Sequence, residues 1–266
     1  MAPERSWPAR FEGHDYPQIL PEPDEIQPGA PAPWATLAPE QRTGLSLPLV
    51  VERLKNGMRH FETAPLPADD RDVAAVSDAQ VRPITRRSAV LVALFEEEGE
   101  TQLVLTRRSF TLREHRGEIA LPGGRSDEGE SPIETALREA REEVGIDESS
   151  VETIGWLSPL ITFAFGSSIW PVIGVLPGRP SFVTDPAEVE RAFTVSLTDL
   201  LADGAFVEEL WRRSPARPGA DTQGYFPIYF YRVPGDLIWG ATARVLTEFL
   251  CVVTDVEWPE AKRVWP

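Results

Sequence analysis

The sequence predicts an α/β fold in which helices cover both faces of a mixed β-sheet. Three observations support this: apolar runs of strand length within residues 89–106, a helix with clear ends over 132–144, and later strand-like runs that finish in an amphipathic helix over 241–252. Strands interspersed with helices bury their apolar faces by packing helices against a sheet. Periodicity alone leaves α/β and α+β architectures both open.

Composition narrows the class of protein. The chain has 266 residues, 42% of them hydrophobic, and no apolar run reaches the roughly 18 residues of a membrane span. The net charge of −16 argues against nucleic acid as an electrostatic partner, because its phosphate backbone would be repelled. One cysteine, Cys251, allows no internal disulfide, and the N-terminus has no apolar signal segment. We therefore expect a cytoplasmic protein that binds neither nucleic acid nor membrane.

The chain is expected to divide into an extension, a domain and a tail. Residues 1–80 form a proline-rich extension, with one short helix at about 47–58 and a polar linker; the domain spans 81–252, and 253–266 are a short tail. The extension is too apolar for a purely solvated segment, so we expect parts of it to pack onto the domain or a second subunit. The residues that suggest this are Trp7, Phe11, Tyr16, Ile19, Leu20 and Trp34.

The domain is expected to begin with a hairpin, in which strands at 89–95 and 102–106 flank a charged turn at 96–100. A loop over 107–117 and a short strand at 118–121 follow. Further strands are expected at 151–157, 161–165, 169–176 and 225–233. Residues 195–201 suit a turn into a short helix, and Thr242 is a plausible cap for the terminal helix.

The helix over 132–144 has signals at both ends. Ser131 suits the N-cap, Pro132 the first turn, and Glu134 the N3 position of a capping box. Gly145 suits the C-terminal stop. These signals fix which residues share a face of the helix.

Three glutamates, Glu139, Glu142 and Glu143, should cluster on one face, because positions three and four apart are neighbours on a helix. Arg138 lies one turn from Glu142 and can hold a carboxylate in place. Packing carboxylates together is unfavourable unless a cation shares their charge. Such oxygen ligands suit Mg²⁺ or Mn²⁺, which also take phosphate oxygens. A solvated acidic helix face is the alternative.

The stretch 124–146 resembles the Nudix box: Gly, five residues, Glu, seven residues, then Arg-Glu-apolar-x-Glu-Glu-x-Gly-apolar. The residues at these positions are Gly124, Glu130, Arg138, Glu139, Ala140, Glu142, Glu143, Gly145 and Ile146. The resemblance implies an α/β/α sandwich with a mixed sheet and a metal-dependent diphosphate hydrolase. It also carries homodimerisation as a family expectation.

The resemblance also implies roles for individual residues. The implied ligands of Mg²⁺ or Mn²⁺ are the carboxylates of Glu139, Glu142 and Glu143 and the backbone carbonyl of Gly123. Arg138 and Glu130 are expected to orient the site. Glu142 or Glu143 is the first choice for the general base, and Glu188, in a loop after the box, is the second.

The segment before the box, residues 103–124, is similar to the signature of the coenzyme A pyrophosphatase branch of Nudix hydrolases. The matching residues are Leu105, Thr106, Arg107, Arg108, Ser109, Leu112, Arg113, His115, Gly117, Pro122, Gly123 and Gly124. Leu121 departs from the family phenylalanine, and Val104 replaces a leucine. The products implied are 3′,5′-ADP and 4′-phosphopantetheine.

The same segment holds the densest basic patch of an acidic chain, and arginine forks suit phosphate oxygens. The expected substrate contacts are Arg107, Arg108, Arg113 and His115. Pairing of these residues with nearby acids such as Glu114 and Glu118 is the alternative.

Two other functions stay open. The first is a Nudix hydrolase for another nucleoside diphosphate derivative, such as ADP-ribose, NADH or a nucleoside triphosphate. The second is a Nudix-like sensor that binds a nucleotide without cleaving it. Sensors usually lose box carboxylates, whereas this chain retains all of them.

Overall fold

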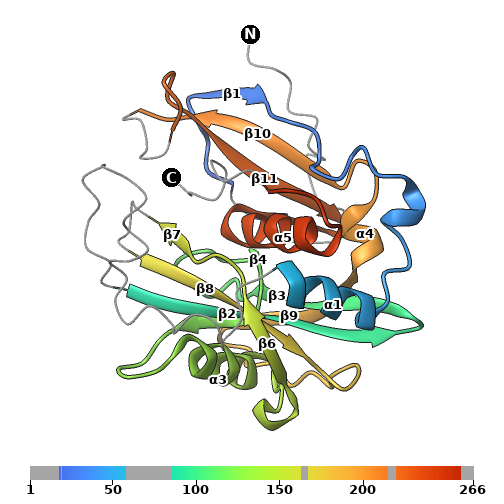
Figure 1. The fold of residues 1–266 in the computed structure, drawn as a ribbon. Helices are drawn as coiled ribbons and strands as arrows, with labels where there is room; N and C mark the ends of the chain where they lie inside the picture. Colours follow the sequence, from blue (N-terminus) through green and yellow to red (C-terminus); the bar gives the residue numbers. More distant parts are fainter. Residues whose placement is uncertain (1–17, 19, 58–85, 163–166, 215–219, 259–266) are drawn as a thin grey trace.

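The computed structural model describes residues 18, 20–57, 86–162, 167–214 and 220–258 (Figure 1). Several sequence predictions concern residues outside these ranges: the polar linker, the domain boundary near residue 81, the tail from 259 onward, and the aromatic residues of the first 17 positions. The division into extension, domain and tail therefore stays a prediction.

The larger of two sheets has eight strands and is mixed, because β2 pairs β8 in parallel while the other pairs are antiparallel. Its main path runs β4-β3-β2-β8-β6, with β5 paired to β2, β7 to β8 and β9 to β3. The strands are β2 (Arg86–Glu97), β3 (Glu100–Arg108), β4 (Ile119–Ala120), β5 (Gly123–Arg125), β6 (Glu152–Trp156), β7 (Leu160–Thr162), β8 (Ser167–Val175) and β9 (Val189–Ser196).

Helices cover both faces of this sheet, which confirms the predicted fold class. One face packs against α3 (Pro132–Val144), and the other packs toward α1 (Leu47–Gly57) and α5 (Gly240–Val253) (Figure 1). Alternation along the central strands produces this arrangement: Leu91 of β2 packs on the α3 side and Val92 on the α5 side. Within the described ranges, no helix has both the length and the apolar character to cross a membrane.

A second sheet of four antiparallel strands lies beyond α5, so that this helix is layered between the two sheets (Figure 1). Its strands, in order, are β1 (Glu25–Pro28), β10 (Phe206–Arg212), β11 (Tyr225–Val233) and β12 (Asp236–Trp239). Only β11 was expected from the sequence. β1 pairs with a strand more than 180 residues away, and such a distant pairing leaves no signal in local periodicity.

The other predicted elements lie within a few residues of the observed ones. β3 runs on to Arg108, and residues 197–201 form α4 (Leu197–Leu201), with single turns η1 (Pro39–Gln41) and η2 (Glu148–Ser150) elsewhere. The expected cap Thr242 is wrong: α5 begins at Gly240, so Thr242 lies inside its first turn, and the N-cap is Trp239, which makes no side-chain capping bond.

The described part of the extension packs onto the domain. Its strand β1 pairs with β10, and Trp34 is only 1% exposed. The Trp34 ring stacks on Tyr231 with centroids 6.4 Å apart and meets Phe206 edge-on at 5.6 Å. Trp34 therefore anchors the extension to the second sheet.

We expect Trp34→Ala to lower the free energy of unfolding by about 3–5 kcal/mol, because it removes a large buried ring. Urea unfolding followed by circular dichroism measures the change. Val183, which is 72% exposed, supplies the control: Val183→Ala should change stability by less than about 0.5 kcal/mol. A midpoint for Trp34→Ala equal to that of the wild type would show that the anchor contributes nothing.

Candidate metal centre

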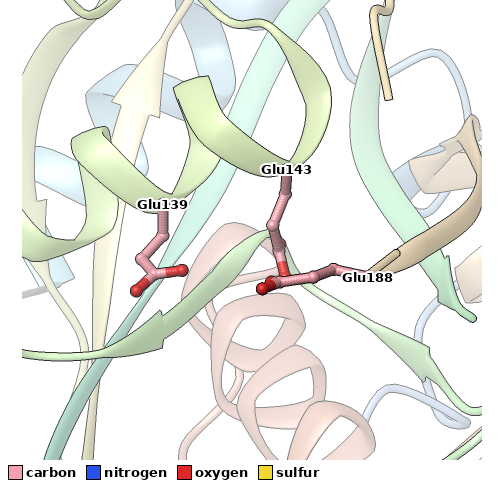
Figure 2. Close-up of side chains that lie close together, drawn as sticks. All are labelled: Glu139, Glu143 and Glu188. Atoms are coloured by element: carbon pink, nitrogen blue, oxygen red, sulfur yellow. The ribbon is translucent and has the colours of Figure 1, made fainter. Parts of the chain in front are cut away.

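The ends of α3 carry the capping residues that the sequence predicts. The Ser131 hydroxyl accepts from the Glu134 amide at 3.3 Å, and the Glu134 carboxylate accepts from the Ser131 amide at 2.8 Å. Gly145 closes the helix with a left-handed φ of 76°. With both ends fixed, Glu139 and Glu143 lie one turn apart and project from the same side of α3 (Figure 2).

Glu139, Glu143 and Glu188 bring their carboxylates together. Each offers an oxygen, and the three oxygens lie within 4.8 Å of one another. Glu188 reaches the cluster from the residue before β9, opposite α3 (Figure 2). The Gly123 amide donates to Glu143 Oε2 at 3.0 Å, which ties the cluster to β5.

Burial makes this cluster electrostatically costly. Glu143 is 3% exposed, and desolvation raises its pKa to about 7, with a further increase from the negative charges of Glu139 and Glu188. Burial also raises the pKa of Glu139, although Arg138 opposes the shift. Three carboxylate oxygens at this range are a hard donor set, and a divalent cation would offset their repulsion. The residues therefore fit Mg²⁺ or Mn²⁺.

Two glycines leave room for the cluster. A Cβ built on Gly124 would lie 2.4 Å from Glu139 Oε2, so any side chain there would displace that carboxylate. A Cβ on Gly123 would lie 2.3 Å from the Ala89 carbonyl oxygen. Strand β5 can pass this close to both α3 and β2 only because positions 123 and 124 are glycines, which have no side chain.

Arg138 organises the acidic side chains around it. Its Nε and Nη2 donate to the two oxygens of Glu130 at 2.7 and 3.0 Å, and its Nη1 donates to Glu139 at 2.9 Å and to Glu142 at 3.0 Å. Nη2 also donates to the Arg125 carbonyl at 3.0 Å. These hydrogen bonds raise the pKa of Arg138. Together with hydrogen bonds donated by the Asp127 amide and the Thr135 hydroxyl, they lower the pKa of Glu130 to about 2.

Glu142, a predicted metal ligand, lies apart from the cluster in this structure. Its side chain is about half exposed and is held by Arg138 and Arg141. Glu188 takes the third place instead. From the sequence, Glu188 was the second choice for the general base and was not expected as a ligand, because it lies 45 residues after Glu143 and only the fold brings the two together.

The three predicted substrate arginines lie in three different environments. Arg107 is buried and paired with Asp236, so the expectation that it meets a substrate phosphate is not supported. Arg108 Nη1 lies 4.0 Å from Glu143 Oε1, at the edge of the cluster. Arg113 is exposed on the following loop.

His115 fits the alternative prediction of pairing with a neighbouring acid. Its Nδ1 lies 3.1 Å from Glu118 Oε2, and this hydrogen bond raises the pKa of His115. His115 also has a positive φ of 55°. The Glu118 amide also donates to the His115 carbonyl at 3.3 Å, so these contacts hold the turn before β4.

Comparison with known proteins identifies the family. Residues 85–214 match the NUDIX domain. The uncharacterized Nudix hydrolase NudL of Photorhabdus laumondii is 39% identical over 162 residues, which cover 60% of this chain and 81% of that protein. This chain belongs to the Nudix family. The chloroplastic Nudix hydrolase 22 of Arabidopsis thaliana is 36% identical over 184 residues, covering 66% of this chain and 58% of that protein.

Among solved structures, the chain is similar to a Caenorhabditis elegans Ap4A hydrolase binary complex, with 22% identity and a TM-score of 0.38 over 43% of this chain and 82% of that one. As a Nudix hydrolase, the protein acts on nucleoside diphosphate derivatives. Its Nudix box, residues 124–146, runs from β5 through α3, and that helix supplies two of the three clustered carboxylates.

The low pKa of Glu130 in the Nudix box predicts a pH-dependent contribution to stability. Because folding lowers this pKa from 4.5 to about 2, the ionised form stabilises the fold above the ordinary pKa, and this stabilisation is lost as pH falls toward about 2. The difference in unfolding free energy between wild type and Glu130→Gln should be constant at neutral pH and shrink on acidification. Urea titrations from pH 7 to pH 3 measure it, and a pH-independent difference would contradict the assignment.

Proposed function

We propose that this Nudix hydrolase cleaves the diphosphate bond of coenzyme A or its derivatives and releases 3′,5′-ADP and 4′-phosphopantetheine. One observation carries the proposal. The segment that resembles the coenzyme A branch includes Arg108, the last residue of β3. Arg108 Nη1 lies 4.0 Å from Glu143 Oε1, so this segment borders the carboxylate cluster. A substrate held by this segment would present its diphosphate to the cluster.

Glu139, Glu143 and Glu188 are the proposed ligands for Mg²⁺ or Mn²⁺, with the Gly123 carbonyl as a further ligand that the family resemblance implies. When bound, the metal offsets the charge of the diphosphate oxygens and lowers the pKa of a water molecule. Arg108 adds a positive charge beside Glu143, where it can donate to a diphosphate oxygen. Arg138 keeps Glu139 in place through a 2.9 Å hydrogen bond and is itself fixed by Glu130.

In the proposed reaction, the oxygen of a water molecule bonds to one phosphorus, and the bridging oxygen leaves with the other phosphate. The water proton passes to a carboxylate of the site. Glu188 is the most exposed of the three clustered carboxylates, and it is the proposed acceptor. Glu142 is less suited, because Arg138 and Arg141 both hold its oxygens.

Arg113 is proposed to bind the 3′-phosphate of coenzyme A, since it is exposed on the loop that follows Arg108.

ADP-ribose, NADH or a nucleoside triphosphate is the alternative substrate class, and Leu121 in place of the family phenylalanine keeps this alternative open. Cytoplasmic location and homodimerisation stay proposals. The non-catalytic sensor does not agree with a chain that retains every box carboxylate.

The full-length protein should be incubated with coenzyme A and, in parallel, with ADP-ribose, each with Mg²⁺, Mn²⁺ or EDTA, and the products identified by mass. We expect 3′,5′-ADP from coenzyme A with either metal and none with EDTA, because the cluster needs a cation. Cleavage of ADP-ribose alone would refute the substrate and retain the metal centre. Coenzyme A cleavage that persists in EDTA would refute the metal centre.

Replacement of single carboxylates distinguishes the observed cluster from the set that the motif implies. Glu143→Gln and Glu188→Gln should each lower kcat by about 10²-fold or more, because each removes a charge from the reacting site. Glu142→Gln should lower kcat less than either, since Glu142 lies outside the cluster. Steady-state kinetics on purified variants, with circular dichroism to confirm folding, give the comparison. A loss at Glu142 larger than at Glu188 would favour the motif-based set.

A further inference from the structure

A buried ion triad links the two sheets immediately beside Arg108. Asp236, at the start of β12, has a fully buried carboxylate that accepts from Arg107 of β3 through Oδ1 and from Arg191 of β9 through Oδ2. Arg107 also lies with its Nη2 3.4 Å from the Gly235 carbonyl. Arg107 and Arg191 face each other as Cα partners in the β3–β9 ladder. One carboxylate of the second sheet thus holds two neighbouring strands of the large sheet.

The β3–β9 ladder changes register directly after this triad. Arg107 pairs with Arg191, but Arg108 pairs with Val189, so Glu190 is the extra residue of a β-bulge. A bulge bends its strand and re-aims the side chains that follow it. Here the side chains beyond the bulge are those nearest the metal centre.

Side-chain packing shows the effect of the bulge. Phe193 packs with the core on the α5 side, as does Leu105 of β3, whereas Ala192 and Val189 both pack on the α3 side. Residues three apart face opposite sides of a regular strand, so only the bulge allows Ala192 and Val189 to share one. On β3, alternation is kept: Arg107 faces the second sheet and Arg108 faces α3.

Two groups of the site depend on the backbone just beyond the bulge. Arg108 places its guanidinium 4.0 Å from Glu143 Oε1. The Ser109 amide donates to the Glu188 carbonyl at 2.8 Å, and the Glu188 amide donates to the Asp185 carbonyl at 3.1 Å, so the backbone of Glu188 is held by β3 as well as by its own loop. A slip of the β3–β9 register would therefore move Glu188 relative to α3 and turn Arg108 away from it.

We propose that Asp236 is a positioning residue for the metal centre: by holding Arg107 and Arg191, it fixes the β3–β9 bulge that presents Glu188 and Arg108 to Glu139 and Glu143. The inference rests on the proposed metal centre and is independent of which diphosphate is cleaved. Breaking any buried ion pair lowers stability, whether or not the pair positions a site. A loss of metal affinity, in contrast, is expected only if Asp236 positions the metal centre.

The test compares Mn²⁺ binding by the full-length protein and by two variants that each break one buried ion pair. Asp236→Asn breaks the triad. Glu248→Gln breaks the buried Arg244–Glu248 pair of α5, which is 3.2 Å long and has side chains 3% and 10% exposed. Both variants should unfold at a lower temperature than the wild type. Only Asp236→Asn should lower the affinity for Mn²⁺, by about tenfold or more, as is typical when a residue that supports a metal ligand is replaced. Isothermal titration calorimetry, well below both unfolding temperatures and without substrate, gives the affinities.

Arg191 supplies a second and milder test, because its side chain is 40% exposed and its loss leaves Arg107 paired with Asp236. Arg191→Met should weaken Mn²⁺ binding, and Arg191→Lys should restore part of it. Unchanged affinity in Asp236→Asn, or in Arg191→Met if the former does not fold, would overturn the positioning role and leave the metal centre standing. No Mn²⁺ binding by the wild type would overturn the metal centre, and the positioning role with it.

Discussion

Repulsion among three clustered carboxylates is the constraint on which the rest of this site depends. Glu139, Glu143 and Glu188 lie within 4.8 Å of one another, and Glu143 is almost fully buried. Like charges at this range separate or take up protons unless surrounding groups hold them. Much of the local architecture can be understood as that support: the Gly123 amide bonds Glu143, and Arg138 bonds Glu139. A divalent cation would offset this repulsion, and that gain favours its binding.

The support is divided between two parts of the fold. Helix α3 and strand β5 belong to one continuous stretch of chain and supply Glu139 and Glu143 with their nearest partners. Glu188 is the residue before β9, a strand whose register is held from the other side of the large sheet by Asp236 of β12. The second sheet is in turn extended by β1 and packed by Trp34. Elements far from the carboxylates thus help to hold Glu188 in position.

Neighbouring arginines illustrate how position along a strand decides chemical role. Arg107 and Arg108 are adjacent in a basic stretch, and composition suggests that both meet phosphate. The pleat sends them to opposite faces of the sheet. Arg107 meets a buried aspartate, where it neutralises a charge and ties two sheets together. Arg108 meets Glu143, where it borders the proposed diphosphate site. Two arginines that are adjacent in the sequence therefore have different roles in the folded protein.

The sequence by itself determined the helix of the box, its capping residues Ser131 and Gly145, and the contact of Arg138 with Glu142, because these depend on spacings within one turn. It also predicted most strands of the large sheet, whose apolar runs are long and continuous. Only the tertiary structure decided that Glu188 joins the cluster, that Glu142 does not, and that a second sheet exists. The place of Glu188 and the second sheet rest on contacts between segments distant in the chain, where register and side-chain direction, rather than local propensity, choose the partner. Glu142 is held away from the cluster by Arg138 and Arg141 of its own helix.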